Sequence, residues 1–246
     1  MAATKIDWAD ITINPITGCS NFGNKKICGD YCYAAKMAKR LKGRFGYPAD
    51  DPFRPTFHPE RLVEIGWNHT KIPSRIFLNS MSDWFSQGVN PDWIHQIIDA
   101  VAKVPEHIFL VLTKRPEKLW IMKGFGTESL ELPSNLWFGV TVTKQRDAWR
   151  IQELTKQLPD QHKFVSFEPL HGPVDPDLTG IEWVIIGAET GHRKGRIEPE
   201  APWITDIFSA AGDRPKFVKD NALLYCPLDW PLWDGSLFQQ FPEGLE

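Results

Sequence analysis

The sequence has 246 residues, of which 42% are hydrophobic and 12% aromatic, enough to bury the core of one α/β domain. A net charge of −3 argues against a protein that coats nucleic acid with its whole surface, and no run of about 18 apolar residues indicates a membrane span. The sequence also does not open with a basic and then apolar leader, so we expect a cytoplasmic protein without a membrane partner.

Apolar runs typical of strands alternate with helix-like segments along the chain. The predicted strands are 11–16, 75–79, 107–113, 136–143, 163–167, 183–187 and 216–219. The predicted helices are 30–42, 91–103, 116–123, 144–157 and 202–211. Strands separated by helices pair in parallel through right-handed crossovers. We therefore predict an α/β fold, a full or partial (β/α) TIM-like barrel of six to seven parallel strands, with a doubly wound open sheet as the alternative.

Two segments depart from this alternation. Residues 43–73 are rich in proline and aromatic residues and are too long for a plain loop, so we interpret them as a lid-like insertion that contacts substrate. Residues 222–246 are rich in proline and tryptophan. We expect them to form a C-terminal tail that packs on a barrel formed by residues 1–221.

Polar residues follow the predicted strands at the points where the strands end. In a (β/α) barrel the carboxyl ends of the strands carry the chemistry, so these residues predict a shared polar mouth. The candidate site residues at these ends are Ser80, Ser82, Asp83, Lys114, Arg115, Glu168, Gly187 and Glu189. Structural alternatives are a helix N-cap for the 80–83 segment and, for Glu168, an ion pair with Lys114, Arg115 or Lys219.

Three of the four cysteines are clustered, with eight residues between Cys19 and Cys28 and three between Cys28 and Cys32. Disulfide scaffolds are typical of small secreted domains, which this chain does not resemble, so the cluster predicts a metal site. Thiolates are soft ligands that suit iron–sulfur clusters and zinc. Three cysteines would leave one iron of a [4Fe–4S] cluster without a protein thiolate.

Structural zinc is the alternative, and it needs four ligands. The fourth could come from Cys226, His58 or His69.

The cysteine motif resembles that of the radical S-adenosylmethionine superfamily. The three cysteines follow the first strand, and the aromatic Tyr31 precedes the last of them, although the cysteine spacing is wider than usual there. The whole chain is also similar to a phage-associated three-cysteine-motif family, the phage Gp37/Gp68-like proteins. The matching stretches are 8–19, 28–35, 80–83, 112–117, 137–142, 164–170, 183–189 and 217–219.

The resemblance implies a [4Fe–4S] cluster on Cys19, Cys28 and Cys32, with S-adenosyl-L-methionine bound to the open iron. An external electron donor would reduce the cluster, and cleavage of the sulfonium would yield a 5′-deoxyadenosyl radical. Tyr31 and the strand-end residues named above would bind this cofactor, with the 80–83 segment near its amino group.

We expect the substrate to be a nucleic acid or nucleotide, for modification or repair, in a bacterial host cell if the protein is phage-encoded. Phage association and two basic stretches, 36–44 and 192–196, motivate this expectation, with a solvated helix face and a solvated loop as the respective alternatives for the two stretches. Some radical enzymes that repair nucleic-acid lesions use a further cysteine as hydrogen donor, and Cys226 is the candidate here, although free cysteines are usually buried apolar residues. The alternatives are a radical enzyme acting on a small metabolite or peptide, and a zinc-stabilised nucleic-acid-binding protein without catalysis.

Overall fold

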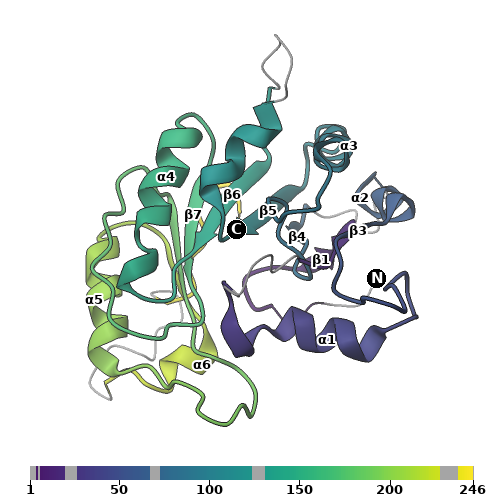
Figure 1. Ribbon diagram of the computed structural model, residues 1–246. Helices are drawn as coiled ribbons and strands as arrows, with labels where there is room; N and C mark the ends of the chain where they lie inside the picture. Colours follow the sequence, from purple (N-terminus) through teal and green to yellow (C-terminus); the bar gives the residue numbers. More distant parts are fainter. Residues whose placement is uncertain are drawn as a thin grey trace. The chain divides into compact units, whose positions relative to one another are not determined.

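The computed structural model describes residues 4, 6–19, 27–66, 73–123, 131–227 and 238–245. Its seven parallel strands have the order β1-β4-β5-β6-β7-β8-β9, so each strand of the sheet follows its neighbour in the sequence (Figure 1). A doubly wound sheet reverses its strand order at one point, and this sheet does not. The order confirms the predicted α/β class and the strand succession of a full or partial (β/α) barrel.

The chain divides into two compact units, Met1–Trp137 and Phe138–Glu246. In the first unit β1 (Ile11–Ile13) pairs with β4 (Arg75–Leu78), which pairs with β5 (Ile108–Thr113). All these pairings are parallel, so the carboxyl ends of the three strands lie at the same edge.

The predicted strand 11–16 is interrupted after β1, and a separate strand β2 (Ile16–Thr17) follows. Pro15 explains the break, because proline has no N–H to donate to a ladder. The short strand β2 pairs in antiparallel fashion with β3 (Thr56–Phe57).

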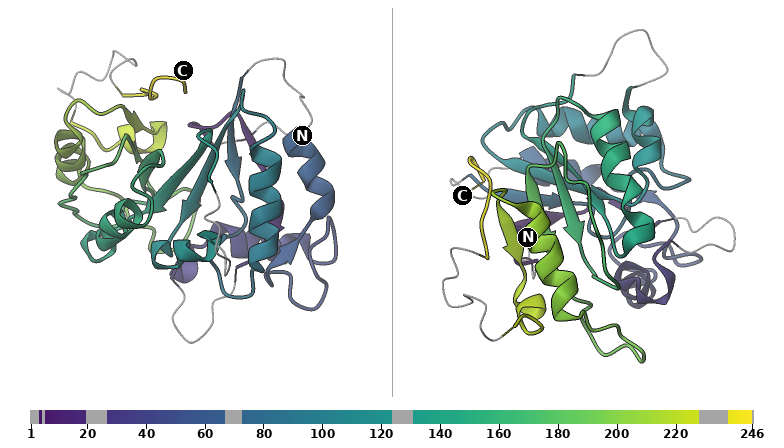
Figure 2. Two further views of the ribbon diagram at one scale, coloured as in Figure 1. Left: turned by 90° about the horizontal axis from the view of Figure 1, so that it is seen from above. Right: turned by 90° about the vertical axis from the view of Figure 1, so that its left-hand side faces the viewer.

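The first unit carries the helices α1 (Tyr33–Leu41), α2 (Leu62–Gly66) and α3 (Pro91–Val101). Its 3₁₀ segments are η1 (Gly29–Tyr31), η2 (Pro59–Arg61) and η3 (Pro116–Lys123), the last of which replaces a predicted α-helix. Helix α3 lies beside α2 (Figure 2) and buries Ile94, Ile97, Ile98 and Val101 along one stripe.

The predicted insertion 43–73 contains β3, η2 and α2, and its pairing through β3 ties it to the start of the chain. Residues 67–72 of this insertion lie outside the described residues. A lid role for the segment stays a prediction.

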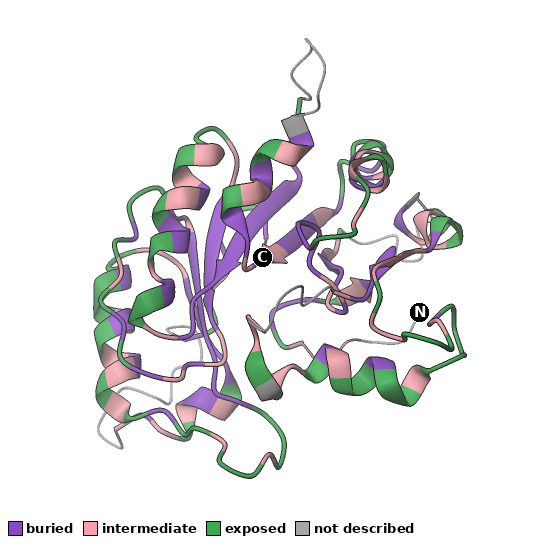
Figure 3. Ribbon diagram, viewed as in Figure 1, coloured by how far each residue is buried: buried purple, intermediate pink, exposed green. Residues whose placement is uncertain are grey.

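The strands of the second unit are β6 (Leu136–Thr141), β7 (Lys163–Phe167), β8 (Trp183–Ile186) and β9 (Lys216–Val218). The first two residues of β6 fall in the first unit. Its helical segments are η4 (Gln145–Asp147), α4 (Trp149–Gln157), α5 (Ala201–Ala211) and α6 (Asp220–Leu223). Every residue of the four strands is buried (Figure 3), as expected for parallel strands that are covered on both faces.

The end of the chain contacts the strands of the second unit. The Gln240 N–H donates to the Lys216 carbonyl at 2.8 Å, and the Trp183 indole N–H donates to the Gln240 carbonyl at 3.0 Å. Residues 228–237 and 246 of the predicted tail lie outside the described residues. Within the described part of the chain, no helix has the length and apolar character needed to cross a membrane.

Candidate functional site

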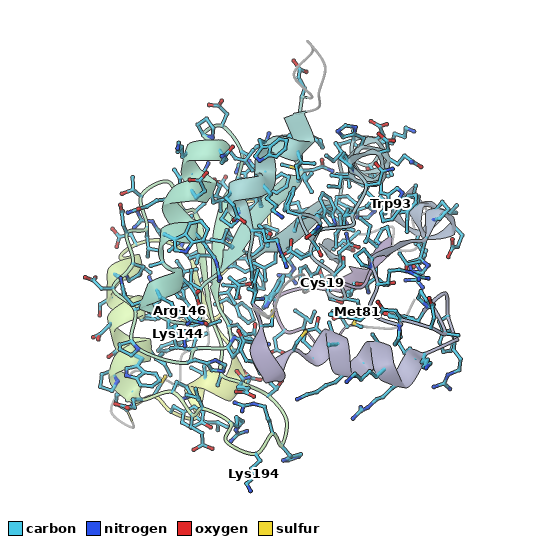
Figure 4. All side chains as sticks on the ribbon, in the orientation of Figure 1. Cys19, Met81, Trp93, Lys144, Arg146 and Lys194 are labelled. Atoms are coloured by element: carbon cyan, nitrogen blue, oxygen red, sulfur yellow. The ribbon has the colours of Figure 1, made fainter. Side chains whose placement is uncertain are left out.

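Cys19 has a backbone that is anchored on both sides. The Gly18 N–H donates to the Met81 carbonyl at 3.0 Å, and the Cys19 N–H donates to the Phe53 carbonyl at 2.9 Å. Gly18 has a φ of +83°, and a Cβ there would collide with the carbonyl oxygen of Arg54. Glycine is therefore required immediately before the first cysteine, which lies beside Met81 in Figure 4.

Cys28 and Cys32 flank the short segment η1, which contains Tyr31. Cys32 is the N-cap of α1, and its Sγ accepts a hydrogen bond from the Ala35 N–H at 3.5 Å. The Cys28 and Cys32 side chains are also hydrogen-bonded to each other. Residues 20–26, which join Cys19 to this pair, lie outside the described residues.

Asp83 links the carboxyl ends of β4 and β5. Its Oδ1 accepts hydrogen bonds from the Phe85 N–H at 3.1 Å and the Thr113 hydroxyl at 2.8 Å. Its Oδ2 accepts from the Lys114 N–H at 3.0 Å and from Arg115 Nη1 at 3.1 Å. This buried carboxylate thus holds the Arg115 guanidinium in a fixed position.

Cys19 lies next to that guanidinium. Arg115 Nη1 donates to Cys19 Sγ at 3.7 Å, and the Ser86 side chain is hydrogen-bonded to the same thiol. Burial, and then the negative charge of Asp83, raise the pKa of Cys19, while Arg115 acts in the opposite direction. Ser86 was not predicted, because a serine in a turn after a strand carries no distinguishing pattern.

Nearby cations also affect the pKa values of the other two thiols, Cys28 and Cys32. The hydrogen bond from Cys32 holds the pKa of Cys28 below its usual value, and the charges of Lys114 and Arg115 add to this effect against burial. The same hydrogen bond, together with burial, raises the pKa of Cys32. The positive charge of Arg115 thus acts on the pKa of Cys19 and Cys28, and that of Lys114 on the pKa of Cys28 and Cys32.

This donor set fits an iron–sulfur cluster. Thiolates are the usual ligands of such clusters. The pKa of Cys28 is lowered towards that form, whereas the pKa values of Cys19 and Cys32 are raised in the metal-free protein. The two cations offset the negative charge that three thiolates and a cluster would bring. Beside them, the Ser82 hydroxyl is buried and has no hydrogen-bond partner among the described residues, which suits a polar ligand.

The zinc alternative needs a fourth ligand beside the three cysteines. Among the described residues, no three side chains of His, Cys, Asp or Glu are grouped around a single ion, and this includes Cys19, Cys28 and Cys32. His58 is engaged elsewhere, because its Nε2 is hydrogen-bonded to the Thr17 hydroxyl at 2.8 Å. His69 lies outside the described residues.

Ser80 has two structural contacts. Its carbonyl accepts a hydrogen bond from the Tyr33 hydroxyl, and its own hydroxyl donates to Asn14 Oδ1 at 3.2 Å. The same Asn14 oxygen accepts from the Met81 N–H at 2.9 Å. These bonds hold the 80–83 segment at the carboxyl end of β1, next to the cysteines.

In the second unit, Glu168 forms an ion pair with Lys219, with 2.7 Å between Oε1 and Nζ. The pair passes over Gly187, where a Cβ would lie 2.9 Å from the Lys219 Cδ and 3.0 Å from the Glu168 Cδ. Glycine at this position therefore avoids a steric clash with the two side chains of the ion pair. A cofactor role for Glu168 and Gly187 stays a prediction.

Glu189 is held by two partners that the sequence did not identify for it. Arg193 donates to its carboxylate through Nε at 2.6 Å and Nη2 at 2.8 Å, and His171 Nε2 lies 2.9 Å from Oε2. The hydrogen bonds from Arg193 lower the pKa of Glu189 to about 2.

The Cys226 thiol donates to the Ala222 carbonyl at 3.7 Å, and burial raises its pKa to about 11. These properties are those of a buried thiol in a helical turn. The hydrogen-donor role of Cys226 stays a prediction.

Three comparisons relate this chain to known proteins. A family model described as "Protein of unknown function (DUF5131)" matches residues 3–215. No curated protein matches the sequence. A solved structure, spore photoproduct lyase complexed with dinucleoside spore photoproduct, is similar with a TM-score of 0.44 and 9% identity, over 87% of this chain and 64% of that one. Because the family model spans most of the sequence, the chain belongs to the DUF5131 family, whose function is unknown.

Proposed function

We propose that this protein is a radical S-adenosylmethionine enzyme in which Cys19, Cys28 and Cys32 hold a [4Fe–4S] cluster. The observation that supports the proposal is the Arg115 guanidinium, which is held by Asp83 and lies 3.7 Å from Cys19 Sγ, together with Cys28 and Cys32 on the segment that begins α1. Lys114 and Arg115 follow β5, at the edge of the first unit where the carboxyl ends of parallel strands meet.

The three thiolates would each bind one iron and leave the remaining iron for the amino and carboxylate groups of S-adenosyl-L-methionine. When bound and reduced by an external electron donor, the cluster would supply the electron that cleaves this cofactor to a 5′-deoxyadenosyl radical. The protein itself positions the ligands and supplies the charges around them.

Lys114 and Arg115 are assigned to charge compensation. Hydrogen bonds and nearby charges at the sulfur ligands set the reduction potential of such clusters. The Arg115 guanidinium contacts Cys19 directly and is held by the Asp83 carboxylate. Both Asp83 oxygens already accept two hydrogen bonds each, so we assign this residue to holding the site together.

Ser82 is the best-supported contact for S-adenosyl-L-methionine, since its buried hydroxyl has no partner in the described part of the chain. Tyr31 and Ser80 lie on the segments that flank the cysteines and complete the proposed contacts of the first unit. In the second unit, Glu168, Gly187 and Glu189 are proposed cofactor contacts.

We propose a nucleic acid or nucleotide as the substrate, for modification or repair, with Cys226 as candidate hydrogen donor. The five exposed cations of residues 36–44, with no acidic residue among them, support this substrate class over a metabolite or peptide. A phage origin and a cytoplasmic location in a bacterial host are proposals as well.

Anaerobic reconstitution with iron and sulfide, followed by reduction and addition of S-adenosyl-L-methionine, tests the proposal. We expect release of 5′-deoxyadenosine, measured by liquid chromatography and mass spectrometry. Cys28→Ser should abolish the release, while the matched variant Cys226→Ser should keep it, because uncoupled cleavage needs no hydrogen donor from that thiol. A fully reconstituted cluster that releases no 5′-deoxyadenosine would refute the proposal.

A further inference from the structure

We propose that the outward face of α1, together with Phe45, is a surface that binds a nucleic-acid strand. Its lysines and arginines would contact phosphates, and the Phe45 ring would stack on a base. That this surface presents substrate to the cysteines rests on the proposed function. That it binds nucleic acid does not depend on the proposed function.

The first observation is an excess of positive charge. Residues 33–49 contain the five cations Lys36, Lys39, Arg40, Lys42 and Arg44 and no acidic residue, although the whole chain has a net charge of −3. All five are exposed. Arg44 is partly explained by its own helix, since its Nη2 donates to the Arg40 carbonyl at 2.6 Å. Among the described residues, no carboxylate forms an ion pair with the other four.

The second observation concerns the orientation of α1. Its apolar side is used within the protein, because Ala34 and Ala38 are buried against Tyr47 and Met81. The cations therefore project from the opposite side, and α1 in Figure 3 alternates between buried and exposed positions accordingly. Lys39 and Arg40 lie in the last turn of α1, where cations favour the helix dipole. Lys36 lies one turn before Arg40, where like charges destabilise a helix, so helix stability does not account for it.

The third observation is Phe45, whose side chain is 72% exposed and whose φ is +52°. A bulky residue in the left-handed region is strained, and such strain is typical of functional positions. The turn is held by Arg61, whose Nη2 donates to the Phe45 carbonyl at 2.7 Å, and by the Tyr47 N–H, which donates to the Arg44 carbonyl at 3.0 Å. An aromatic ring is thus presented to solvent at the end of the basic helix.

These features together favour nucleic acid over an anionic membrane. A helix that binds a membrane surface buries a continuous apolar face in the lipid. In α1, Ala34 and Ala38 are buried inside the protein, and the exposed Tyr33 and Met37 are too few to form such a face. Exposed aromatic rings beside a basic track are the usual means of binding single strands.

The surface also begins at the cysteine site. Cys32 caps the first turn of α1, and the cations follow from Lys36 onward. A nucleic-acid strand bound along this helix would therefore have one end near the proposed cluster, as a substrate must.

Fluorescence anisotropy with labelled single-stranded DNA, single-stranded RNA and duplex DNA, over a series of salt concentrations, tests the surface in the full reconstituted chain. Lys39→Gln/Arg40→Gln should weaken binding at low salt by about tenfold and reduce the salt slope by about 1.4 for single strands. Phe45→Ala should weaken single-strand binding by about tenfold without changing the slope.

Two sets of controls accompany these variants. Lys39→Arg/Arg40→Lys retains the charge and should bind like the wild type. Lys103→Gln and Trp120→Ala remove an exposed cation and an exposed aromatic ring elsewhere in the first unit and should also bind like the wild type.

Unchanged binding by the α1 variants would overturn the inference, as would binding to phosphatidylserine vesicles without binding to oligonucleotides. Release of 5′-deoxyadenosine without substrate should persist in the α1 variants. If the wild type binds oligonucleotides through α1 but releases no 5′-deoxyadenosine, the binding surface is confirmed and the proposed radical chemistry is refuted.

Discussion

At the scale of single residues, Gly18 decides where the first cysteine lies. Gly18→Ala forces a left-handed alanine and a collision with the Arg54 carbonyl, so the backbone of Cys19 must move. Gly88→Ala is the matched control, because it has a φ of +91° but meets only Pro55, at 3.5 Å. We expect about 1–2 kcal/mol of destabilisation from the left-handed alanine in both variants, and a further loss in Gly18→Ala alone.

The measurement is urea unfolding together with the iron content after reconstitution. Gly18→Ala should lose iron and Gly88→Ala should retain it. Equal stability and equal iron content in the two variants would show that Gly18 does not position Cys19.

His58 predicts a pH dependence of stability. Burial, and then the charge of Arg61, lower its pKa to about 4 in the folded protein, whereas the unfolded chain takes up the proton near the ordinary value of 6.5. Between these values the unfolded state binds more protons, so folding stability falls as the pH falls from 6.5 towards 4. The full effect is about 3 kcal/mol at most.

Urea unfolding at several pH values in this window, with wild type and His58→Gln, measures this effect. The variant should show a flatter dependence, although not a flat one, since burial also lowers the pKa of His171. An unchanged pH dependence in His58→Gln would contradict the assignment.

At the scale of elements, the first unit depends on the bond network between the ends of β4 and β5. Asp83→Asn removes the negative partner of Arg115, whose side chain is only 9% exposed, and a buried cation without its partner is costly. We expect a loss of about 3 kcal/mol or more. Asp10→Asn is the matched control: its 2.7 Å pair with Arg75 is more exposed, so its loss should cost about 1 kcal/mol or less.

The free energy of unfolding in urea compares the two variants. Similar losses in Asp83→Asn and Asp10→Asn would mean that the network does not join the two strand ends.

The sequence predicted the strand-end segments well, because each follows an apolar run with a clear period. The ion pair of Glu168 with Lys219 was among the predicted alternatives and is confirmed, but the other contacts between side chains at these ends were not predicted. The acceptor role of Asp83 towards Thr113 and Arg115 depends on two strands becoming neighbours, which no local pattern encodes. The break of the first strand at Pro15 could have been predicted, since the missing N–H is a local property.

At the scale of the whole molecule, the alternation of strands and helices predicted the parallel class and the succession of the strands, and both are confirmed. The division at residue 137 was not predicted, because compactness depends on contacts between distant parts of the chain. The chemistry of the cysteines was inferred from their number and spacing, and the structure adds the Arg115 guanidinium that contacts Cys19.

The most direct test is the metal and sulfide content of the anaerobically purified and reconstituted protein. We predict about four iron and four acid-labile sulfide per chain. Cys19→Ser, Cys28→Ser and Cys32→Ser should each lose them, and Cys226→Ser should retain them. About one zinc per chain with no acid-labile sulfide, or a cluster that survives all three substitutions, would contradict a cluster held by Cys19, Cys28 and Cys32.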